Sequence, residues 1–366
     1  MKVERIALSG FRNYEQECVE FSGATNVIKG ENGQGKTNLL EAVYMLTCGR
    51  SFRTRLDREL VGFGFSNAEI LADVESHGRE QTVRIVLTPG QRKQITVNAV
   101  KKSASELSGG LNSVLFCPDD LDLVREGAAV RRRLMDAAIG QLRPNYAKLA
   151  GEYARLYDQK SAILRDWREK PSLLDALDDF SARMCAVSAK LIRYRAAFVK
   201  RLAEAATPIH REFSGGADEL RLEYATVSTV DDPFKSEKEI FYRVCEHQEA
   251  HRRAEIDSGQ CLTGAHKDDI AISINGRSAR TFGSQGQKRT AALSIKLAER
   301  EIFLQETGEY PVLLLDDVLS ELDAKRQDYV LNRIGSGQTL ITCCEDEGIA
   351  KRTGARVLTI SGGRLV

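Results

Sequence analysis

The stretch Gly30-Glu31-Asn32-Gly33-Gln34-Gly35-Lys36-Thr37 decides the fold of this chain. It matches the pattern G-x-x-x-x-G-K-[ST], in which the glycines let the backbone approach phosphate oxygens and the N–H groups at the following helix start face those anions. Lys36 is expected to reach the β- and γ-phosphates, and the Thr37 hydroxyl to take a place on Mg²⁺. Residues 26–28 predict a strand before the loop, and residues 38–46 predict a helix after it. The motif therefore predicts an α/β fold in which all eight residues bind a nucleotide.

A second apolar segment, residues 311–315, ends in Asp316 and Asp317. A continuous apolar run is typical of a parallel strand that is covered on both faces. Because ligands bind at the carboxyl ends of such strands, we expect Asp316 to hold the Mg²⁺ shell and Asp317 to orient an attacking water. The alternative is that the two acids only end a strand in a turn.

The run GSQGQKR at residues 283–289 opens a predicted helix over residues 285–304. Its apolar residues recur at positions 291, 295, 298 and 302, which is helical spacing. A serine together with the N–H groups of a helix start forms an anion site. We therefore expect Ser284, Gly286 and Gln287 to contact a nucleotide. An ordinary capped helix start is the alternative.

The remaining sequence divides the chain into three parts. Residues 1–118 are rich in predicted strands, residues 119–254 are helical, and residues 255–366 alternate strands with helices. The expected strands are residues 3–8, 18–21, 26–28, 68–74, 82–87, 95–97, 270–274, 312–315, 339–341 and 357–360, with a further helix at 324–334. We expect the first and third parts to fold together as two halves of one lobe, with the second part inserted between them.

The helical part carries apolar residues at steps of three and four from residue 146 to 167, interrupted by Lys160, and again from 177 to 198. Lys170-Pro171-Ser172 interrupts the pattern. Two helices of about 25 residues joined by a short turn predict an antiparallel hairpin roughly 40 Å long. The hairpin is either a protruding arm or part of an ordinary helical subdomain.

Composition limits the function classes. The 366 residues carry a net charge of +1, so any basic surface must be local. Residues 1–8 alternate as a strand rather than forming a signal peptide, and no apolar run is long enough to span a bilayer. The eight cysteines show no C-x-x-C pair, which indicates reduced and mostly buried thiols in a cytoplasmic protein.

Together these motifs resemble the RecF family of SMC-like ABC ATPases. The signature-like run at residue 283, and the D-loop-like run SELD at residues 320–323 after the acidic pair, are typical of ABC-type ATPases. Stretches that match the family are GFRNY at 10–14, GRSFRT at 49–54, FCPDDL at 116–121, RRR at 131–133 and TGAHKDD at 263–269. The resemblance implies an ABC-ATPase head with mixed sheets, flanking helices and an inserted helical lobe carrying a short hairpin.

The resemblance also implies a function. It predicts ATP and Mg²⁺ as cofactors, slow DNA-stimulated hydrolysis, and an ATP-bound homodimer in which Ser284 caps the partner's γ-phosphate. It further implies binding to duplex DNA and gapped junctions, work with RecR and RecO in loading RecA, and a cytoplasmic, nucleoid-associated location. The alternative is an ATP-binding subunit of another ABC-type assembly, a transporter or a scaffold, without a DNA role.

Other residues are assigned by the same resemblance. Arg12 and Asn13 are expected near the nucleotide. Two basic clusters, Arg50 with Arg53 and Arg55, and residues 131–133, are candidates for DNA phosphates or the partner's nucleotide, or are solvated faces.

The chain also departs from the usual patterns. Asp317 stands where most ABC ATPases have glutamate, which predicts slow turnover, and Lys267 stands where the family often has arginine. No histidine follows the strand at 339–342, and no clear glutamine loop lies near residue 118. His266 is either a catalytic base or a structural or interface histidine.

Overall fold

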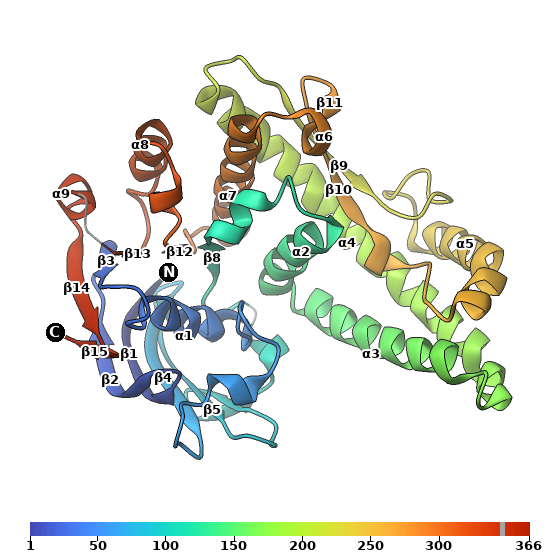
Figure 1. Cartoon of the computed structure of the whole chain (residues 1–366), viewed down its shortest axis with the longest axis horizontal. Helices are drawn as coiled ribbons and strands as arrows, with labels where there is room; N and C mark the ends of the chain where they lie inside the picture. The colour runs from blue at the N-terminus through green and yellow to red at the C-terminus, as the bar shows by residue number, and fades with distance from the viewer. Residues whose placement is uncertain (108, 345–347) are drawn as a thin grey trace. The chain divides into compact units, whose positions relative to one another are not determined.

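The computed structural model describes residues 1–107, 109–344 and 348–366. It divides the chain into two compact units, one made of residues 1–122 and 292–366 and the other of residues 123–291 (Figure 1). Helix α7 (Gln285–Thr307) crosses the second boundary. Among the described residues, no helix is both long and apolar enough to cross a membrane.

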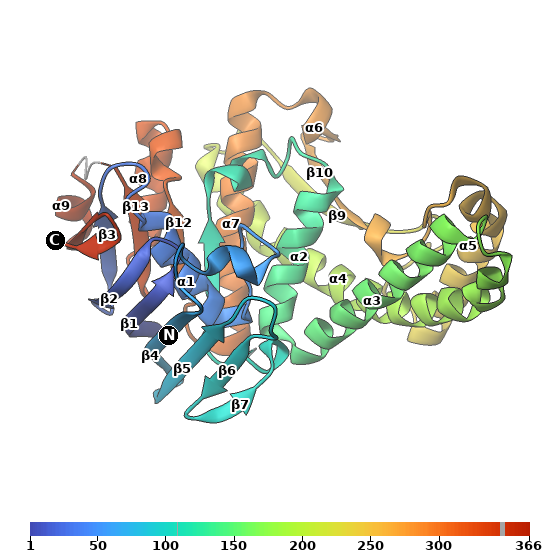
Figure 2. The same ribbon diagram turned by 60° about the horizontal axis from the view of Figure 1, so that its bottom comes forward.

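The first unit contains an antiparallel sheet in the order β2-β1-β4-β5-β6-β7, whose central strands lie side by side in Figure 2. Its strands pack one face on the core, which β4 demonstrates by alternating buried and half-buried residues along its length. The bounds are β1 (Lys2–Phe11), β2 (Tyr14–Glu20), β4 (Ala68–Ser76), β5 (Arg79–Leu87), β6 (Gln94–Val97) and β7 (Val100–Lys102).

The second sheet of this unit has the order β15-β14-β3-β13-β12-β8 and is parallel except for β15. Every residue of β12 is buried, as is typical of a central parallel strand in a sheet that is covered on both faces. One strand, β13, separates β3 from β12, so the residues that follow these two strands share one edge of the sheet. The bounds are β3 (Thr25–Lys29), β8 (Ser113–Phe116), β12 (Val312–Asp316), β13 (Thr339–Cys343), β14 (Arg356–Ser361) and β15 (Arg364–Leu365).

Helix α1 (Lys36–Cys48) joins the two sheets through one apolar core that includes residues of β1, β4, β5, β12 and β13. Leu39, Leu40 and Met45 are fully buried in this core. The helix ends at Gly49, whose left-handed backbone (φ 64°) lets its N–H bond the Met45 carbonyl, as is common at helix ends. Two short helices, α8 (Ala324–Arg333) and α9 (Ile349–Thr353), also belong to this unit.

The second unit contains the predicted helical hairpin. Helices α3 (Pro144–Asp166) and α4 (Leu177–Phe213) lie side by side in both views (Figures 1 and 2). They are antiparallel, because Leu164 near the end of α3 shares an apolar cluster with Leu177, whereas Tyr146 near its start contacts Tyr194. At 37 residues α4 is longer than expected, and it packs also on α5 and β9. The hairpin is therefore part of a packed subdomain.

The rest of this unit is a small antiparallel sheet in the order β11-β10-β9 with further helices. The bounds are α2 (Ala128–Leu142), β9 (Leu220–Ala225), α5 (Glu237–Ser258), β10 (Asp269–Ile274), β11 (Arg277–Ser278) and α6 (Ala279–Phe282). We expected the third part of the chain to begin near residue 255, but residues 255–291 pack within the second unit. The reason is that β10 pairs with β9 along six residues, and this pairing is not visible in local periodicity.

The cysteines also differ from the expectation of mostly buried thiols. All eight are free, but only Cys185, Cys261 and Cys343 are buried. Cys18 and Cys344 are exposed.

Candidate nucleotide-binding site

The phosphate loop connects β3 to α1, as its sequence predicts. Lys36 is only 4% exposed, and its Nζ donates to the carbonyl oxygens of Gly30 at 2.6 Å and Glu31 at 3.0 Å. The Lys36 side chain therefore folds back over the phosphate loop and bonds the backbone at its start. Gly35 has a φ of 114°, and a Cβ there would lie 2.7 Å from the Asn13 amide. Glycine allows this path because it has no side chain to clash and no penalty for a positive φ.

The structure brings the phosphate loop and the acidic strand together. The Thr37 hydroxyl donates to Asp316 Oδ1 at 2.8 Å, and the Thr342 hydroxyl donates to the same oxygen at 2.9 Å. The Asp316 side chain is buried, and burial raises the pKa of its carboxyl although the two hydroxyl donors oppose that shift. Two neighbouring strands and the helix thus converge on one buried carboxylate.

Asp317 follows in a left-handed backbone conformation with φ of 53°. Its N–H donates to Thr342 Oγ1 at 2.9 Å, and Ser320 Oγ donates to its carbonyl at 2.6 Å. A non-glycine residue holds such a conformation only where its surroundings impose it, and these residues cluster at functional sites. Thr342 therefore orients both acids. Its hydroxyl donates to the Asp316 carboxylate and accepts from the Asp317 N–H.

Arg12 and Asn13 form the turn between β1 and β2. Asn13 Nδ2 donates to the Gln34 carbonyl at 2.9 Å, and Asn38 Nδ2 donates to Asn13 Oδ1 at 2.8 Å. The turn is therefore bonded directly to the phosphate loop. Each guanidinium nitrogen of Arg12 donates to a protein oxygen, two of them on Glu41. The structure makes Arg12 a tie between this turn and α1.

Glu41 is a functional candidate that the sequence reasoning missed. It is fully buried on α1 and accepts two hydrogen bonds of 2.8 Å from Arg12. It also accepts a hydrogen bond from the Ser51 hydroxyl, and Arg53 Nη1 lies 3.6 Å from it. The sequence did contain one sign of this residue, namely an acid within an otherwise apolar stretch of the predicted helix. A carboxylate in such a stretch is buried and therefore requires partners.

The C-terminal hairpin of β14 and β15 also holds the phosphate loop, a role that no sequence pattern indicated. Gly362 N–H donates to Gln34 Oε1 at 2.6 Å, and Gly363 N–H donates to the Gln34 carbonyl at 2.9 Å. Gly363 has a φ of 74°, and a Cβ there would lie 2.2 Å from the Asn13 carbonyl oxygen. Gln34 is therefore held by both the hairpin and the β1–β2 turn, which donate to the same carbonyl oxygen.

Cys344 occupies the position after β13 where many ABC proteins carry a histidine. Its thiol donates to Asn32 Oδ1 at 3.0 Å, and its Sγ lies 3.7 Å from Lys36 Nζ. A thiol thus stands at this position in place of a histidine, and it contacts the phosphate loop. Gly33, the remaining loop glycine, has a φ of 79°.

Ser284, Gly286 and Gln287 belong to the second unit. Ser284 is exposed and directly precedes α7. It exchanges two hydrogen bonds with Gln287 in the first turn of that helix. Its N–H donates to Gln287 Oε1 at 2.9 Å, and its hydroxyl accepts from Gln287 N–H at 3.2 Å. Gln287 Nε2 also donates to Asp218. The serine therefore caps a helix and still faces solvent, which is compatible with both interpretations of the motif.

The TGAHKDD stretch is a buried network in the second unit. His266 Nδ1 bonds the Tyr153 hydroxyl at 2.8 Å, and Nε2 lies 3.2 Å from the Cys261 carbonyl. Burial lowers the pKa of His266 to about 4. Both ring nitrogens are occupied, so the geometry favours the structural histidine over the catalytic base. Arg195 bridges Asp268 and Asp136 at 2.7 and 2.9 Å.

The basic run at residues 131–133 is not a uniform surface. Arg131 is buried and forms a bidentate pair with Asp269 at 2.6 and 2.9 Å. Arg132 donates to the Asp268 carbonyl at 2.7 Å, and only Arg133 is exposed. The first two arginines hold the second unit together.

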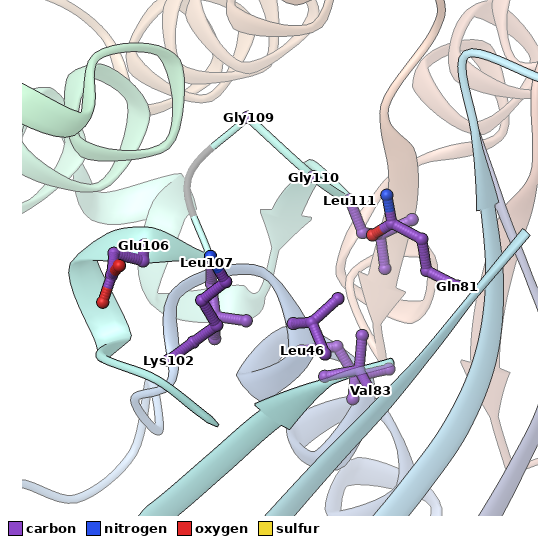
Figure 3. A pocket seen from close by; sticks show the side chains of 10 residues that line it. Leu46, Gln81, Val83, Lys102, Glu106, Leu107, Gly109, Gly110 and Leu111 are labelled. Atoms are coloured by element: carbon purple, nitrogen blue, oxygen red, sulfur yellow. The ribbon is translucent and has the colours of Figure 1, made fainter. Parts of the chain in front are cut away.

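A separate pocket of about 240 Å³ lies in the first unit between β5 and the segment around residue 107 (Figure 3). Leu46, Val83 and Leu107 supply apolar walls, and Gln81, Lys102 and Glu106 supply polar ones. It includes no residue of the phosphate loop or the acidic pair. It is therefore distinct from the site described above.

Similarity to known proteins extends over the whole chain. The family model of the RecF/RecN/SMC N terminal domain matches residues 2–360. "DNA replication and repair protein RecF" of Bacillus subtilis (strain 168) is 38% identical over 379 residues, covering 100% of both chains. The protein of that name from Acetivibrio thermocellus is 38% identical over 348 residues, covering 95% of this chain and 94% of its own.

Solved structures agree. The recombination mediator protein RecF-ATP in the RecFOR pathway matches with a TM-score of 0.89 at 31% identity, covering 100% of this chain and 96% of that chain. The Smc head bound to the C-winged helix domain of ScpA matches with a TM-score of 0.57 at 17% identity over 100% and 97% of the two chains, which shows the fold alone. The predicted α/β fold of an ABC-ATPase head is confirmed. The chain belongs to the RecF family of SMC-like ABC ATPases.

Proposed function

We propose that this ATPase is a DNA-binding protein of recombinational repair, which closes as a homodimer on duplex DNA beside single-strand gaps when it binds ATP. The observation that carries the ATP part of the proposal is the 2.8 Å contact between Thr37 and Asp316, because it joins the phosphate loop to the acidic strand. Similarity over the full chain to proteins named for DNA replication and repair supports the DNA role.

ATP binds at the phosphate loop in this proposal. The N–H groups at the start of α1 and the positive end of the helix dipole attract the phosphates. Lys36 Nζ exchanges the carbonyl oxygens of Gly30 and Glu31 for the β- and γ-phosphate oxygens. Asn13 and the C-terminal hairpin keep the loop in place through Gln34, so the binding site is preorganised.

The residues present fit Mg²⁺. Thr37 Oγ1 and Asp316 Oδ1 already lie 2.8 Å apart, and both are hard oxygen ligands of the kind this ion prefers. Burial raises the pKa of the Asp316 carboxyl, and a cation bound beside this carboxylate would oppose that shift. When bound, the ion neutralises charge on the phosphates. The protein contributes the position of the two ligands, which Thr342 supports by its second hydrogen bond.

Asp317 orients the attacking water in this proposal. Its backbone is held by Thr342 and Ser320, so its side chain starts from a defined position. Aspartate is one methylene shorter than the glutamate of most ABC ATPases and reaches a water less well. Hydrolysis is accordingly slow, and DNA binding stimulates it.

Dimerisation depends on the exposed Ser284. Each copy places Ser284, with Gly286 and Gln287, over the γ-phosphate of the other copy's ATP. ATP favours the dimer because it gains these contacts only there, and a ligand shifts an equilibrium only by such differential affinity. We expect Lys36→Met to abolish ATP-driven dimers in light scattering, and Ser284→Arg to block dimers while sparing ATP binding. A collapse of nucleotide affinity in Ser284→Arg would refute the contact in trans.

The closed dimer holds the duplex through its backbone, without reading sequence, and works with RecR and RecO in loading RecA. We expect a cytoplasmic protein associated with the nucleoid. The test is fluorescence anisotropy with duplex DNA, with ATP and then ADP, at two salt concentrations. Tight and salt-sensitive binding that weakens with ADP supports the proposal. Binding that ignores the nucleotide, or no binding, removes the DNA role and leaves the ATPase.

A further inference from the structure

The segment between α1 and β4, residues 49–67, is a firmly held surface loop that we call the 49–67 loop. Its backbone is bonded to the β1–β2 turn, because Arg12 N–H donates to the Leu60 carbonyl at 2.8 Å and Gly62 N–H donates to the Gly10 carbonyl at 2.8 Å. Arg12 Nη1 also donates to the Glu59 carbonyl at 2.8 Å. The loop is therefore bonded to the end of β1 and the β1–β2 turn at residues 59, 60 and 62, next to its tip.

Phe63 lies at this tip with its side chain entirely in solvent. Its relative exposure is 104%, the highest among the large apolar residues in the described parts of the chain, where Val366 at the C-terminus comes next with 75%. The reason is a tight turn, in which Phe65 N–H donates to the Gly62 carbonyl at 3.1 Å and Gly64 has a φ of 85°. This turn directs the aromatic ring outward, although burial would favour the opposite.

Unpaired positive charge accompanies the ring on the same loop. Arg50, Arg55 and Arg58 are exposed, and within the described residues their guanidinium groups form no hydrogen bond or ion pair. Of the two acids on the loop, Asp57 pairs with Lys93 at 2.8 Å, whereas Glu59 is exposed and accepts a hydrogen bond from Thr54 at 2.5 Å. The loop that presents Phe63 therefore also carries three exposed arginines that the described residues leave unpaired.

We propose that the 49–67 loop binds unpaired DNA bases next to the duplex, with Phe63 stacked on a base and Arg50, Arg55 and Arg58 on the neighbouring phosphates. Aromatic stacking with basic side chains along the backbone is how proteins hold single strands without reading sequence. This inference rests on the proposed function and adds the DNA feature that the site recognises.

The 49–67 loop also contacts the helix that carries the phosphate loop. Arg53 Nη1 donates to Asn38 Oδ1 at 2.7 Å, and Asn38 in turn donates to Asn13 beside Gln34. The loop that presents Phe63 is thus connected to the nucleotide site through the hydrogen bonds of Arg53, Asn38 and Asn13. We infer that gapped DNA stimulates hydrolysis more than blunt duplex does.

The experiment compares Phe63→Ala with the wild type on gapped DNA and on blunt duplex of equal length, with ATP. A stacked base contributes about 1–3 kcal/mol, so gapped-DNA affinity should fall by about 5- to 150-fold. Blunt-duplex affinity and the ATPase rate without DNA should stay within about twofold. Phe234→Ala, which truncates an exposed phenylalanine in the second unit, is the matched control and should leave both affinities unchanged.

A second variant reports the contact directly. The chain has one tryptophan, Trp167, so the wild-type emission serves as the blank for Phe63→Trp. The added emission should be quenched by gapped DNA and not by blunt duplex. Equal losses on both DNAs in Phe63→Ala, or no loss on either, overturn the stacking role. A wild type that binds no DNA with ATP overturns the proposed function, and with it this inference.

Discussion

Replacing Glu41 by alanine removes the buried carboxylate that joins α1 to the β1–β2 turn. Glu41 is fully buried, the Arg12 side chain is 19% exposed, and two hydrogen bonds of 2.8 Å connect them. Removing one partner of a buried ion pair costs about 3–5 kcal/mol, because the other charge stays without compensation. Since Arg12 is partly exposed and can turn toward water, we expect the lower end, about 3 kcal/mol.

The assay is urea unfolding followed by circular dichroism. At a slope of about 3 kcal/mol per molar urea, that loss of stability lowers the midpoint by about 1 M. The matched comparison is Glu41→Leu alone and combined with Arg12→Met, which replaces the whole pair by apolar side chains. Replacing a buried pair in this way is often close to neutral, so the double variant should be more stable than Glu41→Leu alone.

Two results would refute this reasoning. A Glu41→Ala midpoint within about 0.2 M of the wild type would mean that the pair contributes little to the stability of the folded state. A double variant less stable than Glu41→Leu would mean that Arg12 stabilises the turn through its bond to the Glu59 carbonyl rather than through the pair.

Three further perturbations test other contacts of the structure. Gly363→Ala should weaken ATP binding in a nucleotide titration, because the new Cβ would lie 2.2 Å from the Asn13 carbonyl oxygen. Gly362→Ala is the matched control, since a Cβ there has no atom within 4 Å. Equal effects of the two variants on ATP binding would contradict the role of the hairpin. Thr342→Val removes a hydroxyl donor that lowers the pKa of Asp316, so the acid limb of the ATPase pH profile should shift to higher pH, and an unshifted limb would argue against it. Burial lowers the pKa of His266 to about 4, whereas the imidazole in the unfolded chain has a pKa of 6.5. Between pH 4 and 6.5 the unfolded chain therefore binds more protons than the folded protein. Stability should fall by up to about 3 kcal/mol as the pH drops through this range, and a thermal-melt series of His266→Gln that keeps this fall would contradict the assignment.

Much of the first unit was predictable from local sequence. The phosphate loop, its flanking strand and helix, and the strand ending in Asp316 were predicted, because each is a contiguous segment with its own periodicity or glycine pattern. The helical hairpin was predicted for the same reason. The extent of α4 and the boundary near residue 255 were missed, because the later residues are held by pairing of β10 with β9 rather than by a local signal.

The sequence by itself determined the nucleotide-binding class of this protein and the residues that form the loop. Only the tertiary structure decided what holds that loop. Gln34 and Gly362 are 328 positions apart, and Thr37 and Asp316 are 279 positions apart. Periodicity and motifs report the backbone path of neighbouring residues, whereas these bonds depend on where distant strands meet in the sheet. Three other features also depend on where distant segments meet. They are the hydrogen bonds of Arg12, the thiol of Cys344 beside Lys36, and the outward ring of Phe63.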